Sequence, residues 1–77
     1  MSPDKMIHMA NQIAAFFHTQ PGEDGAGKVA AHIADFWEAR MRRQLLAHVD
    51  AGGEGLDPLV MAAAARLRTE AVENPRG

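Results

Sequence analysis

The sequence predicts an all-α protein, a small bundle of about four short helices joined by short loops. No segment shows the apolar–polar alternation of a half-buried strand. Two serine- or aspartate-proline pairs mark helix starts, and glycine-rich segments interrupt the helical periodicity. At 77 residues, the chain is interpreted as one small helical domain, 1–77, with a flexible tail at about 73–77.

The first helix is expected to begin at Ser2-Pro3. A serine N-cap accepts hydrogen bonds from free amides, and proline at the first helical position loses none. From Met6 to Phe17 the apolar residues cover about half of the helix circumference, more than the roughly 100° that one core contact requires. The opposite side holds His8, Asn11, Ala15 and His18. A stripe this wide indicates an intermolecular face.

A loop is predicted over Gln20–Gly27, which contains three glycines and a proline. It does not match a phosphate-binding loop, because no strand precedes it and its glycine spacing fits neither nucleotide fingerprint. The second helix is expected over Lys28–Trp37.

The middle of the chain changes the direction of its apolar stripe. On one continuous helix, the arc that contains Ile33 and Trp37 would be displaced by roughly 140° from the arc that contains Met41 and Leu45. The first arc comprises Val29, Ile33, Phe36 and Trp37, and the second comprises Met41, Leu45, Leu46 and Val49. Either the helix breaks near Glu38-Ala39, or one helix shows two faces to two neighbours; we favour the break.

The third helix is then predicted over about Ala39–Val49, ended by Gly52-Gly53. Asp57-Pro58 is a second N-cap and first-turn proline, and it predicts a fourth helix from Leu59 to about Ala71.

Composition narrows the function classes. A net charge of −2 argues against nucleic acid as the main ligand. No apolar run is long enough to span a bilayer, and the N-terminus lacks signal-peptide features, so a cytoplasmic location is expected. There is no cysteine for a disulfide or a thiolate-metal site. Much of the apolar fraction is alanine, which buries little area. We therefore expect that a partner protein supplies part of the buried surface that stabilises this chain.

We expect no catalytic, cofactor-binding or metal-binding residue. Histidines 8, 18, 32 and 48 form no pair at helical metal-ligand spacing and are expected to face solvent. Asp35 with Glu38, and Glu23 with Asp24, are paired carboxylates, but a chain this small seldom encloses the pocket that acid–base chemistry requires.

The aromatic and arginine residues suggest a partner-binding face instead. The hypothesis assigns this role to Phe16, Phe17, Trp37, Arg40, Arg42 and Arg43. On the third helix Arg42 falls inside the apolar arc, whereas Arg40 and Arg43 point away from it. The alternative for Arg42 is a side chain that lies along the apolar stripe, and for Trp37 a place in the core.

Three blocks in this order resemble a known family. They are Ser2–Ile13 followed by Phe16-Phe17, then Ile33–Arg42 with its Phe-Trp and Arg-Met-Arg, and Gly55–Val60. Together they are similar to the delta subunit of the soluble, molybdenum-containing, NAD-dependent formate dehydrogenases of bacteria, from Ser2 to about Arg68.

The resemblance implies a non-catalytic accessory subunit of a cytoplasmic complex. In that complex a large subunit oxidises formate with a molybdenum cofactor and iron–sulfur clusters, and other subunits use FMN to reduce NAD. The expected partners are those subunits, chiefly the large one, with no nucleic acid and no membrane. Three alternatives stay open: a transient assembly chaperone for the molybdenum-containing subunit, a self-associating helical module, and a small independent enzyme.

Overall fold

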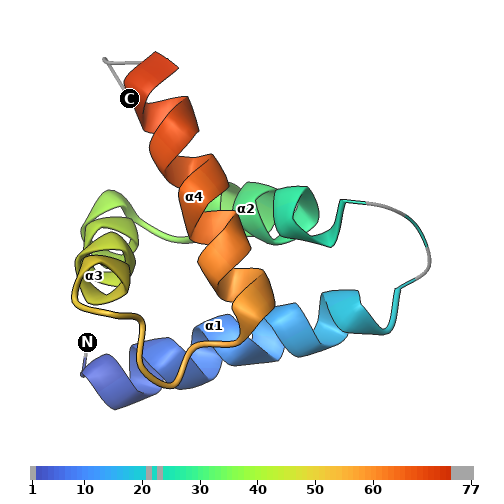
Figure 1. Ribbon diagram of the computed structural model, residues 1–77, viewed down its shortest axis with the longest axis horizontal. Helices are drawn as coiled ribbons and strands as arrows, with labels where there is room; N and C mark the ends of the chain where they lie inside the picture. Colours follow the sequence, from blue (N-terminus) through green and yellow to red (C-terminus); the bar gives the residue numbers. More distant parts are fainter. Residues whose placement is uncertain (1, 21, 23, 74–77) are drawn as a thin grey trace.

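The computed structural model describes residues 2–20, 22 and 24–73, with the backbone alone for 69–73. This part of the chain forms four helices: α1 (Pro3–His18), α2 (Gly25–Phe36), α3 (Ala39–Asp50) and α4 (Pro58–Glu73). Helix α4 crosses α2 and contacts each of the other three helices (Figure 1). The all-α prediction is confirmed.

Both proline-marked helix starts are confirmed. The Ser2 hydroxyl accepts a hydrogen bond from the Lys5 amide at 3.3 Å, and α1 begins at Pro3. The Asp57 carboxylate accepts from the Leu59 amide at 2.8 Å, and α4 begins at Pro58. Each cap satisfies an amide that has no partner within the helix.

Helix α2 begins at Gly25, three residues earlier than the composition predicted. Asp24 adopts a left-handed conformation (φ 59°), and its carboxylate accepts from the Gly27 amide at 3.2 Å. Arg66 of α4 binds the two oxygens of that carboxylate at 2.6 and 3.0 Å, and this contact lowers the pKa of Asp24. A Cβ at residue 27 would collide with the capping carboxylate. Only glycine fits at position 27, so Gly27 is part of the first turn of α2 and not of a preceding loop.

The predicted break near Glu38-Ala39 is confirmed. Helix α2 ends at Phe36, Trp37 is extended (φ −94°, ψ 136°), and Glu38 is the N-cap residue of α3. One residue of the expected buried arc behaves differently: the Phe36 side chain is 74% exposed, whereas Trp37 is 5% exposed. The chain leaves the helix between them, so helical periodicity no longer relates their directions.

The core is drawn from all four helices. Its buried residues are Met6, Ala10 and Ala14 of α1, Val29, Ala30 and Ile33 of α2, Trp37, Leu45 of α3, and Val60, Ala63 and Leu67 of α4. Alanines let the helices approach closely, but each buries little apolar area. Helix α4 ends at Glu73, two residues beyond the prediction, and residues 74–77 of the expected flexible tail lie outside the described residues.

Candidate partner-binding surface

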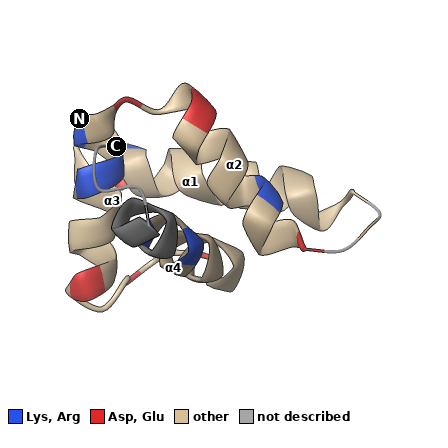
Figure 2. Ribbon diagram, turned by 90° about the horizontal axis from the view of Figure 1, so that it is seen from above, with Lys and Arg blue, Asp and Glu red and all other residues tan. Residues whose placement is uncertain are grey.

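An open apolar groove of about 580 Å³ lies between α1 and the C-terminal half of α2. Its lining residues are Met9, Gln12, Ile13, Phe16 and Phe17 of α1, His32 and Phe36 of α2, and Trp37. From Met6 to His18, α1 carries no lysine, arginine, aspartate or glutamate, and Figure 2 shows α1 and α2 as largely uncharged ribbons. The groove is therefore an uncharged surface on a chain of ordinary charge content.

Two phenylalanines in the groove remain open to solvent. Phe16 is 57% exposed and Phe36 is 74% exposed. The Phe16 ring meets the Phe17 ring edge to face, with centroids 5.1 Å apart. Phe17 is half-buried against the core. Exposed aromatic side chains beside a buried one are typical of surfaces that a partner covers.

His32 packs between aromatic rings of both helices. Its ring centroid is 4.7 Å from that of Phe36 and 6.3 Å from that of Phe17. The side chain is half-buried, so the prediction of a solvent-facing histidine is wrong at this position. It is also wrong for His48, which is half-buried and 2.8 Å from the carbonyl oxygen of Glu54.

Trp37 lines the groove at the corner between α2 and α3. Its amide donates to the Ile33 carbonyl at 2.9 Å, and its side chain belongs to the core. The guanidinium of Arg42 donates to the carbonyl of Trp37 and, at 3.3 Å, to that of Ala34. Arg42 thus satisfies carbonyls at the end of α2 that have no helical partner.

The three arginines of α3 fall into two groups. Arg42 is half-buried, as its place in the apolar arc predicted, and its bonds to α2 were not foreseen. Arg40 and Arg43 are exposed and point away from the core, as predicted. Within the described residues the structure therefore brings Phe16, Phe17 and Trp37 together, joins Arg42 to them through the Trp37 carbonyl, and leaves Arg40 and Arg43 on the outer face of α3.

The sequence interpretation missed five groove residues: Met9, Gln12, Ile13, His32 and Phe36. The spacing of Met9, Ile13 and Phe16 along one helical face was available as a signal. His32 and Phe36 are also one helical turn apart. Which face of α1 meets which face of α2 depends on the packing of α4 and could not be read from spacing.

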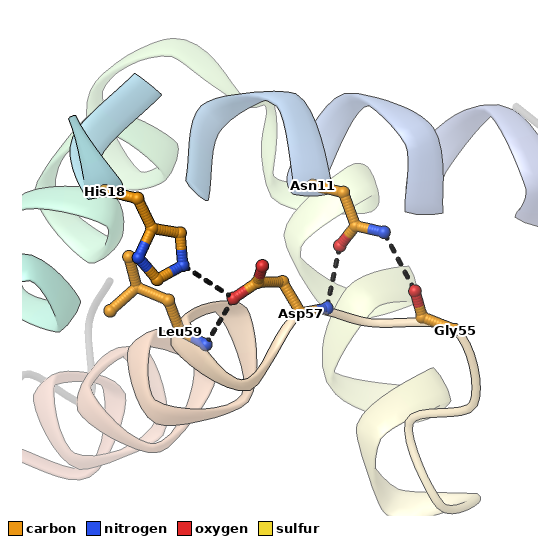
Figure 3. A network of polar contacts seen from close by, with 5 residues as sticks. All are labelled: Asn11, His18, Gly55, Asp57 and Leu59. Atoms are coloured by element: carbon orange, nitrogen blue, oxygen red, sulfur yellow. Dashed lines mark hydrogen bonds and ion pairs between the residues drawn. The ribbon is translucent and has the colours of Figure 1, made fainter. Parts of the chain in front are cut away.

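The other flank of α1 is closed by polar contacts (Figure 3). The Asn11 side chain donates to the Gly55 carbonyl at 2.8 Å and accepts from the Asp57 amide at 2.8 Å. His18 lies 3.1 Å from the Asp57 carboxylate. Hydrogen bonds from the Leu59 amide and from His18 lower the pKa of Asp57. Asn11 and His18, predicted to lie opposite the packed side, thus tie α1 to the segment that enters α4.

Neither a metal site nor a membrane span emerges from the described residues. No three histidine, aspartate or glutamate side chains within this part of the chain are placed to hold a metal ion, and the full sequence has no cysteine. None of the described helices combines the length and apolar character needed to cross a membrane.

Residues 5–64 match the family described as NADH-dependent formate dehydrogenase delta subunit FdsD. This chain belongs to that family. The match covers the whole groove and all the residues of the polar flank, and it ends within α4. It confirms the resemblance stated from the three sequence blocks. A comparison with curated proteins found no match.

A delta subunit of a formate dehydrogenase is part of an oxidoreductase, and the other subunits of that enzyme are its partners. The groove contains Phe16 and Phe36, the two large hydrophobic side chains that are exposed among the described residues.

Proposed function

We propose that this chain is a non-catalytic accessory subunit of a cytoplasmic, NAD-dependent formate dehydrogenase. It docks on the large formate-oxidising subunit and supports the assembly or stability of the holoenzyme. Family membership supports the complex, and the groove with its exposed Phe16 and Phe36 supports the docking. Docking would remove both rings from water, which is the main favourable term in most protein association.

The proposal assigns the redox cofactors to other subunits. The molybdenum cofactor, the iron–sulfur clusters, FMN and NAD belong there, because this chain has no cysteine for cluster ligation and no glycine-rich nucleotide fingerprint. This chain contributes to the complex a surface that contacts the large subunit. The docking face includes Phe16, Phe17 and Trp37, with Arg40 and Arg43 on the adjoining helix as rim contacts and Arg42 holding the corner.

The small size of the core supports dependence on a partner. A chain of this length typically has a stability margin of about 3–5 kcal/mol. Its helix α3 contributes one fully buried residue, Leu45. A partner that binds the folded form adds stability in proportion to the logarithm of its concentration over Kd.

The test is affinity purification of the tagged chain from its native cytosol, with formate-dependent NAD reduction assayed on the eluate. Active eluate that contains the large subunit at equal stoichiometry is the expected result. Recovery of an inactive large subunit without its molybdenum cofactor would instead identify a transient assembly chaperone. Recovery of the tagged chain alone, with a mass that rises with concentration, would identify a self-associating module.

A further inference from the structure

We infer that the groove binds a short amphipathic helix of the partner subunit, which inserts uncharged apolar side chains between α1 and α2. The inference rests on the proposed function and names the chemistry of the occupant. It follows from the charge, the hydrogen-bonding groups and the size of the groove.

The absence of charged residues in the lining limits which side chains of a partner can enter the groove. The eight lining residues include no lysine, arginine, aspartate or glutamate. A charged group buried there would lose its hydration without gaining an ion-pair partner, which is strongly unfavourable. The inserted side chains are therefore uncharged. Aliphatic or aromatic groups would pack against the rings of Phe16, Phe17 and Phe36.

Hydrogen bonding limits the backbone of the occupant. Gln12, His32 and the indole N–H of Trp37 are the side-chain hydrogen-bonding groups in the lining, and the backbones of α1 and α2 are bonded within their own helices. An extended segment would bury amides and carbonyls that these three side chains are too few to satisfy. A helix satisfies its own backbone, and an amphipathic helix in an apolar groove is a recurrent binding mode.

Size limits the length of the occupant and argues against a second copy of this chain. Met9 and Phe17 lie two helical turns apart, about 12 Å along α1. The occupant therefore buries about two turns. A stable homodimer would need about 20–30 residues and about 800 Å² from each copy, which is nearly a sixth of the total 5071 Å² of this chain. Eight residues, with Trp37 already in the core, fall short of that requirement, whereas a larger partner subunit can supply the remaining area through contacts outside the groove, including the rim at Arg40 and Arg43.

The test replaces Gln12 in the tagged chain by residues of both charge signs. Gln12 is an exposed residue of the lining, so Gln12→Glu and Gln12→Lys change the groove with little effect on the core. Gln20→Glu and Gln20→Lys are the matched controls, because Gln20 is exposed and outside the groove. Binding is measured as the Kd for the purified large subunit.

An apolar occupant predicts that both Gln12 variants weaken binding by more than about tenfold, because either charge would be buried without a partner. The two Gln20 variants should bind like the unmodified chain. Opposite effects of Glu and Lys at residue 12 would overturn the inference, since they would indicate a charged occupant. Unchanged binding by both Gln12 variants would also overturn it. If the unmodified chain fails to bind the large subunit, the proposed function itself fails.

The helical form of the occupant is tested by photo-cross-linking in the purified complex. A photoreactive phenylalanine analogue at position 16 or 36 should react with one short partner segment, at residues spaced three or four apart. Attachment at alternate residues would indicate an extended segment and would overturn the inference. Attachment between two copies of this chain would do the same.

Discussion

The two flanks of α1 lie on either side of one buried line of residues, Met6, Ala10 and Ala14. They differ in what their side chains contact. On one flank, Asn11 and His18 bond to the segment around Asp57. On the other flank, apolar side chains line a groove that this chain leaves open. The polar flank is satisfied within the chain, and the apolar flank is not. In this small bundle, hydrogen bonds tie one flank of α1 to the segment that enters α4, while apolar side chains on the other flank stay open to solvent.

A substitution in the buried line between the flanks should have the largest effect on stability. Met6→Ala removes a fully buried side chain and should lower the free energy of unfolding by about 2–5 kcal/mol. That loss is comparable with the whole margin expected for a chain of this size. Met9→Ala is the matched control on the groove flank, where the side chain is half-buried, and it should have a smaller effect. Urea denaturation followed by circular dichroism measures both; equal losses would contradict the assignment of the core.

A substitution in the polar flank should give the second-largest effect on stability. Asn11→Ala leaves the Asp57 amide and the Gly55 carbonyl without their side-chain partner and should lower the free energy of unfolding by about 1–3 kcal/mol. Its neighbour Gln12 faces the groove, so Gln12→Ala should change stability by less than about 0.5 kcal/mol. The same denaturation experiment separates the two neighbours. If Gln12→Ala is as destabilising as Asn11→Ala, the polar flank has no special role.

Removal of the Asp57 cap should give a smaller effect that depends on pH. Asp57→Ala should lower the free energy of unfolding by about 1 kcal/mol at pH 7, because the Leu59 amide loses its acceptor. The pKa of Asp57 is lowered in the folded state, so its contribution is complete above its ordinary value of 3.8 and is lost as pH falls through the folded value.

The measurement is the free energy of unfolding of both proteins between pH 2 and pH 7. The difference between the unmodified chain and Asp57→Ala should be constant near neutral pH and should shrink in acid. A difference that grows as the pH falls would have the wrong sign and would contradict the role of the carboxylate.

The sequence predicted the parts of the fold that local chemistry determines. Ser2-Pro3 and Asp57-Pro58 marked helix starts, and the rotated apolar arc marked the break at Glu38. The start of α2 was predicted too late, because three glycines indicate a loop. The helix begins earlier because Asp24 is its N-cap, and the Asp24 carboxylate is bound by Arg66, 42 residues away in the sequence.

The candidate surface was predicted only in part, since it depends on contacts between distant segments. The width of the apolar stripe on α1 indicated an intermolecular face, and Phe16 and Phe17 do line the groove. The exposure of Phe36 follows from the helix end immediately after it, and the inward bonds of Arg42 follow from the corner at Trp37.

We propose that the polar flank stabilises the fold and that the apolar flank binds the partner. The most direct test compares Asn11→Ala with the double variant Phe16→Gln and Phe36→Gln, measuring for each the free energy of unfolding and the Kd for the large subunit. The double variant should unfold within about 1 kcal/mol of the unmodified chain, because both rings are largely exposed, and should bind more than about tenfold more weakly. Asn11→Ala should be less stable but should bind normally once folded. Unimpaired binding by the double variant, or a loss of stability larger than that of Asn11→Ala, would contradict the claim.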